Sequence, residues 1–247
     1  MKPNSGDVTD PFLLAIETAG SRCSAAVARG DLVLAAESLA LRHGHAEALL
    51  PMIDRVMAAA GLCSAQLDVV AAATGPGGFT GIRVGLAAAH GIALGTGARL
   101  IGVTSFAAVA AGVASAEGGR DAVLLVALDS RREDLYVQLF AADWMTPLAA
   151  PAALLPAELA DHVGRLAGGA ALLVAGDAAE AAAAALPGHA DITIAHGSAP
   201  DAPGVIAAAR RQLSGGAAGP VRPLYLRPPD VTLPRRRAAG ASPVATS

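Results

Sequence analysis

The stretch LDVVAAATGPGGFTGIRVGLAAAHGIALGT at residues 67–96 predicts three consecutive pieces of structure, namely a strand, a glycine-rich turn and a helix. Residues 67–73 are apolar except for Asp68 and show no alternation, as in a strand buried on both faces of a parallel sheet. Residues 74–81 hold four glycines, and the helix is expected over 79–96. A buried strand that leads through a tight turn into a helix is typical of an α/β fold.

Outward from this stretch, the sequence divides into two halves with a similar order of elements. In the first half we expect strands at 12–17, 23–29, 32–41, 67–73 and 99–103, and helices at 46–60, 79–96 and 105–116. In the second half we expect strands at 122–128, 134–142, 171–174 and 191–194, and helices at 156–166, 178–186 and 203–213. The order in the first half is that of a ribonuclease-H-like unit, and two such units in tandem predict the actin-like ATPase fold.

The expected domain boundaries follow from this division. The predicted lobes span residues 12–117 and 118–228, between polar or Pro/Ala/Ser-rich ends at 1–11 and 229–247 that we expect to be disordered. The chain carries a net charge of -3, which argues against a protein that binds nucleic acid by itself. Its one basic cluster, Arg235–Arg237, falls in the C-terminal tail.

The sequence also predicts where the protein works. The two cysteines, Cys23 and Cys63, are too few for the disulfide framework of a small secreted domain and are expected to be free thiols in a reducing cytoplasm. The N-terminus lacks the apolar segment of a signal peptide, and no apolar run approaches the length of a membrane span. We therefore expect a cytoplasmic protein without a membrane partner.

The glycine-rich turn has two interpretations. Gly75, Gly77 and Gly78 could present backbone N–H groups to an anion at the start of a helix. Glu17 and Thr18 follow the first strand, where actin-like ATPases place an acid and a hydroxyl near phosphate and magnesium. The turn matches neither the dinucleotide fingerprint nor the Walker P-loop, so a tight strand-to-helix connection without a ligand is the other interpretation.

The helix beyond the turn carries a stripe of small residues, which we interpret as a docking surface. The stripe and the positions close to it are Gly81, Gly85, Ala88, Ala89 and Ile92. Because glycine costs about 1 kcal/mol relative to alanine inside a helix, these glycines need a compensating reason. A flat face of small residues lets a second helix approach closely.

The helix that meets this stripe can belong to the same chain or to a partner, and we expect both. Within the chain, the 46–60 helix supplies apolar positions at helical spacing, including Leu49, Ile53 and Met57. These three residues and the stripe together form the predicted partner interface.

No residue pattern predicts catalysis, a metal or a cofactor. His43 and His45 are two residues apart, unlike the histidine pairs of helical metal sites. The sequence also lacks a visible Ser/His/Asp or Cys/His nucleophile arrangement. We expect no catalytic residue, no metal site and no cofactor.

Five segments resemble, in order, the bacterial TsaB (YeaZ) family over about residues 12–230. They are FLLAIET (12–18), RHGHAEALLP (42–51), TGPGGFTGIRVGLAAAHGIA (74–93), LDSRREDLY (128–136) and PLYLRP (223–228). The resemblance implies an actin-like fold without activity of its own, in a subunit that joins TsaD and the ATPase TsaE. That assembly installs a threonylcarbamoyl group on N6 of the adenosine beside the anticodon in tRNAs that read ANN codons.

The resemblance also implies how the subunits meet. The first two helices of the N-terminal lobe, here 45–60 and 79–96, would contact TsaD, or a second copy of the chain when TsaD is absent. TsaD would hold the metal through an H-x-x-x-H pair that this chain lacks. The chain departs from the family at Glu17-Thr18-Ala19, where DTS is common, and at Asp129-Ser130-Arg131, where DAR is common.

Two other functions stay open from the sequence. A small-molecule kinase of the actin-like superfamily would need two phosphate loops and a catalytic acid. A glycoprotease-like metallopeptidase would need a bound metal.

Overall fold

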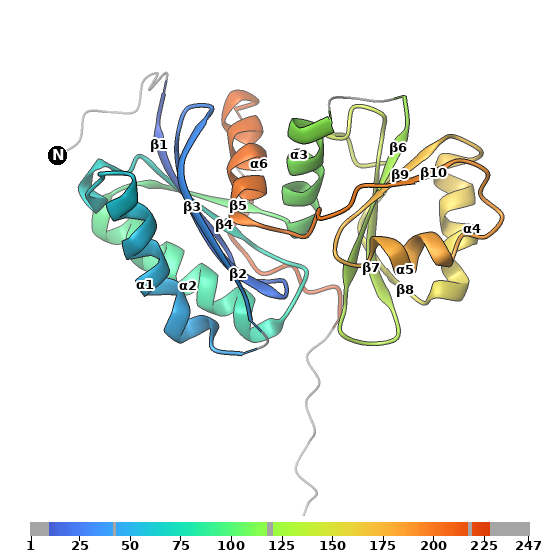
Figure 1. The fold of residues 1–247 in the computed structure, drawn as a ribbon, viewed down its shortest axis with the longest axis horizontal. Helices are drawn as coiled ribbons and strands as arrows, with labels where there is room; N and C mark the ends of the chain where they lie inside the picture. The colour runs from blue at the N-terminus through green and yellow to red at the C-terminus, as the bar shows by residue number, and fades with distance from the viewer. Residues whose placement is uncertain (1–9, 42, 118–120, 217–218, 228–247) are drawn as a thin grey trace, which may run out of the picture.

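A computed structural model of the chain describes residues 10–41, 43–117, 121–216 and 219–227. Of the ends predicted to be disordered, residues 1–9 and 229–247, with Arg235–Arg237, lie outside these residues, whereas Asp10 and Pro11 lie within them. Two five-stranded sheets stand side by side, with helices on their outer sides and two helices between them (Figure 1). None of the described helices combines the length and apolar character needed to cross a membrane.

The two sheets repeat one topology. The first has the order β3-β2-β1-β4-β5, from β3 (Leu32–Ala40), β2 (Arg22–Arg29), β1 (Phe12–Glu17), β4 (Val69–Ala73) and β5 (Arg99–Val103). The second has the order β10-β9-β6-β7-β8, from β10 (Ile192–Ile194), β9 (Leu172–Ala175), β6 (Val123–Asp129), β7 (Leu135–Phe140) and β8 (Ala152–Leu154). In each sheet the first three strands in chain order are antiparallel and the later two are parallel to the first. These are two ribonuclease-H-like units, and the predicted actin-like fold is confirmed.

Each sheet is covered on both faces. α1 (His45–Ala59) and α2 (Phe79–Thr96) lie on the outer side of the first sheet, and α4 (Pro156–Ala167) and α5 (Ala179–Ala184) lie on the outer side of the second (Figure 1). α3 (Ser105–Glu117) and α6 (Ala202–Ser214) stand between the sheets (Figure 1). A short 3-10 turn, η1 (Ser64–Gln66), precedes β4. The sequence predictions missed η1 and β8, which are three residues each.

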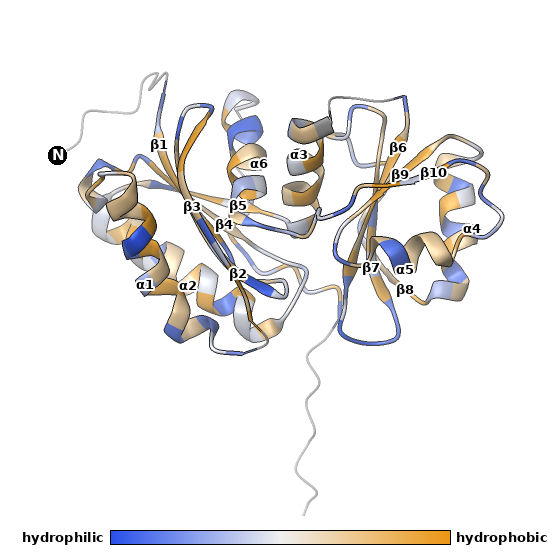
Figure 2. Cartoon of the chain, in the orientation of Figure 1, coloured by the Kyte–Doolittle hydropathy of each residue, from blue (hydrophilic) through white to orange (hydrophobic). Residues whose placement is uncertain are grey.

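The central strands have apolar side chains on both faces of the sheet, so helices must pack on both faces. In β1 the alternate residues Leu14 and Ile16 pack in the core under α1 and α2. Leu13 and Ala15 point the other way, into the core under α6. Every second side chain faces the same side of a strand, so the continuous apolar run buries both faces. Figure 2 shows the strands of both sheets as largely hydrophobic.

Each of the two helices between the sheets packs on the sheet formed by the other half of the chain. Val205 of α6 packs on the first sheet, although the helix comes from the second half of the chain. Phe106 and Val109 of α3 pack in the core of the second sheet, although that helix comes from the first half. The two helices also approach closely, because a Cβ at Gly204 would overlap the Ala108 carbonyl oxygen. Each helix therefore packs across the boundary expected between residues 117 and 118.

Candidate nucleotide site and candidate docking face

The predicted nucleotide position begins at Glu17, the last residue of β1, whose side chain is fully buried. Its Oε1 accepts hydrogen bonds from the backbone N–H groups of Ala19 and Gly20, and its Oε2 has no hydrogen-bond partner among the described residues. The pKa of Glu17 is raised to about 7, chiefly because burial disfavours the charged carboxylate. The two N–H groups oppose this rise, and the nearby carboxylates of Asp201 and Asp177 contribute to it. This carboxyl is therefore shielded from water and lies near other carboxylates.

The other predicted nucleotide contacts surround the turn after Glu17, but their polar groups bind within the chain. The Thr18 hydroxyl donates to the carbonyl oxygen of Gly81 at 2.8 Å. The Gly78 N–H donates to the carbonyl oxygen of Ala19 at 2.7 Å, and a Cβ at Gly77 would overlap that same oxygen. The glycines thus allow close packing of two backbone segments. The hydroxyl and N–H groups that would face a phosphate are engaged with protein oxygens instead.

Gly75 likewise packs against its own chain. A Cβ at Gly75 would overlap the side chain of Ile82 and lie 3.2 Å from the carbonyl oxygen of Leu224. The Leu224 N–H in turn donates to the carbonyl oxygen of Thr74 at 2.8 Å. The C-terminal segment of the described chain therefore binds beside the glycine-rich turn, a contact that sequence reasoning did not anticipate.

The turn between β6 and β7 approaches the same place from the second sheet. Arg131 donates from Nη2 to the carbonyl oxygen of Gly20 at 3.0 Å. The Asp129 N–H donates to Asp177 Oδ1 at 2.9 Å, which ties this turn to the end of β9. Burial raises the pKa of Asp177, and the neighbouring Asp129 adds to the rise. The sequence showed Arg131 only as a departure from a motif, whereas in the structure it links the two halves.

The histidines and cysteines do not gather into a metal centre. Within the described ranges, no group of three or more His, Cys, Asp or Glu side chains could hold a metal ion. His45 is buried at the start of α1, and burial lowers its pKa, with the nearby Arg131 guanidinium adding to the effect. Cys23 is a buried free thiol and Cys63 an exposed one.

Most residues of the predicted docking surface are buried within the chain. On α1, the predicted contacts Leu49, Ile53 and Met57 are buried in the chain's own core. The reason is amphipathicity: the apolar positions of an outer helix face the sheet beneath it.

On α2 the small-residue stripe also faces inward. A Cβ at Gly81 would overlap the Thr18 carbonyl oxygen, and one at Gly85 would overlap the Thr18 hydroxyl. Ala89 is fully buried in the same core. The stripe therefore allows close approach of a helix to a strand, and Gly81, Gly85 and Ala89 face the chain's own core.

The outward side of α2 carries the exposed small and apolar residues that were predicted for the stripe. Leu94 is 88% exposed, and nothing lies within 4 Å of a Cβ built at Gly91 or Gly95. Ala87 is exposed as well, and the predicted residues Ala88 and Ile92 are half-buried at its margin. On α1, Leu50 is 54% exposed. We call this surface the outer face of α1 and α2, defined by Leu50, Ala87, Gly91, Leu94 and Gly95.

Comparison with known proteins gives the family. Residues 38–187 match the family model described as TsaD, tRNA N6-adenosine threonylcarbamoyltransferase. The chain is 34% identical over 124 residues to the tRNA threonylcarbamoyladenosine biosynthesis protein TsaB of Escherichia coli, covering 50% of this chain and 52% of that protein. The chain thus spans about half the length of the curated TsaB relatives it matches.

Two further proteins align over most of the chain. An uncharacterized protein of Mycobacterium tuberculosis is 34% identical over 221 residues, covering 88% of this chain and 92% of that one. The solved structure of YeaZ from Pseudomonas aeruginosa shares the fold with a TM-score of 0.73 at 23% identity, covering 87% of this chain and all of that one. The chain belongs to the TsaD family, whose model is described as tRNA N6-adenosine threonylcarbamoyltransferase, and it is similar to the TsaB (YeaZ) proteins.

Proposed function

We propose that this chain is a non-catalytic docking subunit of a tRNA threonylcarbamoyladenosine-forming complex, and that its outer face of α1 and α2 binds TsaD. TsaE would join this pair as the ATPase of a ternary complex. The reaction would transfer a threonylcarbamoyl group to N6 of the adenosine beside the anticodon in tRNAs that read ANN codons. Both described cysteines are free thiols, which suits a cytoplasmic site of action.

The observation that carries the proposal is the composition of the outer face of α2. A Cβ at Gly91 or Gly95 would meet none of the described residues within 4 Å, so no contact among them requires glycine there. Each costs about 1 kcal/mol of helix stability relative to alanine. Leu94 adds an apolar side chain that is 88% exposed. Small residues beside an exposed leucine provide a flat apolar surface on which a partner helix can pack closely.

The packing around Thr18 supports a role without nucleotide chemistry. The Thr18 hydroxyl donates a hydrogen bond to the Gly81 carbonyl oxygen, and the Gly78 N–H donates one to the Ala19 carbonyl oxygen. These two donors are therefore not available to a phosphate. A small-molecule kinase would need these groups for ATP. Calorimetric titration of the isolated chain with ATP and Mg²⁺ is expected to show no binding, and tight binding with turnover would favour the kinase.

The docking face is tested by co-purification of the tagged chain with TsaD of the same organism. Gly91→Arg and Ala87→Arg place a long charged side chain on the outer face without disturbing the core, and both are expected to lose TsaD. Gly164→Arg is the matched control, because Gly164 is an exposed glycine of α4 with nothing within 4 Å of its Cβ position. It should retain TsaD.

Normal recovery of TsaD by both outer-face variants would show that the interface lies elsewhere. When TsaD is absent, we propose that the same apolar face pairs two copies of the chain. Light scattering of the isolated chain then gives the mass of a dimer, and Gly91→Arg gives the mass of a monomer.

A further inference from the structure

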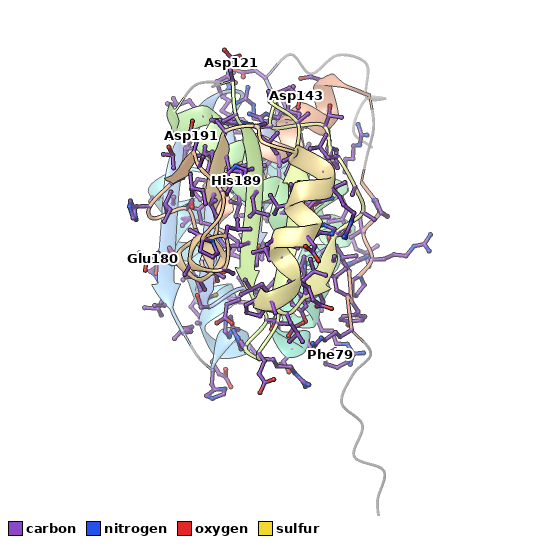
Figure 3. The ribbon with its side chains drawn as sticks, turned by 90° about the vertical axis from the view of Figure 1, so that its right-hand side faces the viewer. Phe79, Asp121, Asp143, Glu180, His189 and Asp191 are labelled. Atoms are coloured by element: carbon purple, nitrogen blue, oxygen red, sulfur yellow. The ribbon has the colours of Figure 1, made fainter. Side chains whose placement is uncertain are left out.

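A small hollow lies on the surface where the glycine-rich turn, the β6–β7 turn and the C-terminal segment meet. Its volume is about 180 Å³, and its lining includes Gly78, Phe79, Arg132, Tyr225 and Arg227. Figure 3 shows Phe79 at the lower edge of the molecule. Figure 2 shows the β6–β7 turn, which carries Arg132, as a hydrophilic loop at the same edge.

Aromatic side chains are concentrated at this hollow. The chain contains four Phe, two Tyr and one Trp, and three of these seven, Phe79, Tyr136 and Tyr225, line it. The Phe79 and Tyr225 rings lie 5.2 Å apart, and the two residues remain 38% and 39% exposed. Arg83 stacks over the Phe79 ring at 3.6 Å and donates from Nε to the Tyr225 hydroxyl at 3.2 Å. The rings are therefore held in fixed positions at the surface.

The charged side chains among the described residues that line the hollow are arginines, although the whole chain has a net charge of -3. They are Arg132 and Arg227. Asp134, which pairs with Arg227 at 2.7 Å, is buried behind it. The Arg131 guanidinium approaches Gly78, since its Nη1 would lie 3.4 Å from a Cβ there. A net charge of -3 describes the whole chain and does not apply to this surface.

The N-terminus of α2 adds to this positive character. Gly78 is the N-cap residue, no side chain caps the helix, and the first turn contains no acidic residue. Gly77, Gly78 and Phe79 bring this end of the helix to the hollow. The helix dipole favours an anion at such a position.

We propose that this aromatic and arginine-lined hollow binds single-stranded RNA, with a base stacked on Tyr225 and Phe79 and its phosphate between Arg132 and the start of α2. Stacking on fixed aromatic rings beside arginines is how proteins hold unpaired bases. The volume is below the range of about 300–1,000 Å³ typical of small-molecule pockets, which favours a polymer lying across the hollow over an enclosed free nucleotide. The choice of RNA rests on the proposed function in tRNA modification.

The test measures the fluorescence anisotropy of a 5′-fluorescein-labelled single-stranded RNA decamer titrated with the full chain. Tyr225→Leu is expected to weaken binding about fivefold or more, because it removes a stacking ring. Tyr225→Phe keeps the ring and loses only the hydroxyl, so it should bind within about twofold of wild type. Arg132→Ala should weaken binding and reduce the slope of log Kd against log salt by about 1.

The charge-matched control is Arg165→Ala, which removes an exposed arginine of α4 and should bind the decamer like wild type. Absence of RNA binding by the full chain, or equal binding by wild type, Tyr225→Leu and Arg132→Ala, overturns the proposal. Displacement of the decamer by AMP at an equal concentration of nucleotides overturns it in favour of a free-nucleotide site. Displacement by inorganic phosphate alone would show that the bases contribute nothing and also overturns it.

The two proposals can fail separately. Gly91→Arg is expected to lose TsaD and to bind the decamer normally, because the outer face lies away from the hollow. If Gly91→Arg retains TsaD while Tyr225→Leu loses RNA, the docking face is wrong and the RNA site stands. If Gly91→Arg loses TsaD while Tyr225→Leu binds RNA normally, the docking face stands and the RNA site is wrong.

Discussion

Replacing Glu17 with glutamine is expected to stabilise the chain at and above neutral pH. The Glu17 carboxyl is fully buried, and its Oε2 has no hydrogen-bond partner among the described residues. A glutamine carbonyl can still accept the N–H groups of Ala19 and Gly20, while the amide carries no charge that burial penalises. The substitution therefore removes an unfavourable charge and keeps the shape.

The magnitude follows from the pKa. Burial raises the pKa of Glu17 from its ordinary value of 4.5 to about 7, which corresponds to about 3 kcal/mol. Because the folded pKa lies above the unfolded one, the protonated side chain favours the folded state fully below about pH 4.5. That contribution is lost as the pH rises toward 7. Glutamine lacks this dependence, so the advantage of the variant grows with pH.

The assay is urea unfolding at pH 5 and pH 8, followed by the fluorescence of Trp144, the single tryptophan of the chain. The free energy of unfolding of Glu17→Gln minus that of wild type is expected to be about 2 kcal/mol or more larger at pH 8 than at pH 5. In thermal unfolding at pH 8, the variant should melt about 6–12 °C above wild type. The same difference at both pH values, or a less stable variant at pH 8, would refute the reasoning about the buried charge.

Four further substitutions test the packing and the surfaces. Gly91→Ala should raise the free energy of unfolding by about 0.5–1 kcal/mol, since its Cβ meets open space. Gly85→Ala should lower the melting temperature, because its Cβ would overlap the Thr18 hydroxyl. Equal changes in stability for Gly91→Ala and Gly85→Ala would contradict the assigned helix faces. Arg131→Ala should lower the free energy of unfolding in urea by about 1 kcal/mol through loss of the bond to Gly20, and an unchanged midpoint would show that this link carries no stability. Leu94→Glu should convert a dimer of the isolated chain to a monomer in light scattering, whereas an unchanged mass would place the self-contact elsewhere.

Most of the fold could be predicted from local patterns. Strands at 12–17 and 99–103 and the helix at 79–96 have the observed bounds, because apolar runs and glycine turns mark their ends clearly. β8 is three residues long and half-buried, which leaves too little periodicity to recognise. The exchange of α3 and α6 between the sheets could not be predicted either, since a helix of small residues carries no information about which sheet it covers.

The candidate sites were predicted less well, and the reason is geometric. The spacing of Gly81, Gly85 and Ala89 correctly indicates close packing, but spacing alone cannot say whether the close neighbour is a strand beneath the helix or a partner outside it. In the structure that neighbour is Thr18 of the same chain. The hollow at Phe79 and Tyr225 joins residues more than 140 positions apart, and no local pattern connects them.

The central claim is that this chain contributes a docking surface and not chemistry, and it is tested most directly by threonylcarbamoyl transfer to tRNA in a complex reconstituted with TsaD and TsaE. Glu17→Gln, at the predicted nucleotide position, should support transfer within about twofold of wild type. Gly91→Arg should reduce transfer at least tenfold, and the control Gly164→Arg should not. Full transfer by Gly91→Arg together with loss of transfer by Glu17→Gln in an intact complex would contradict the claim.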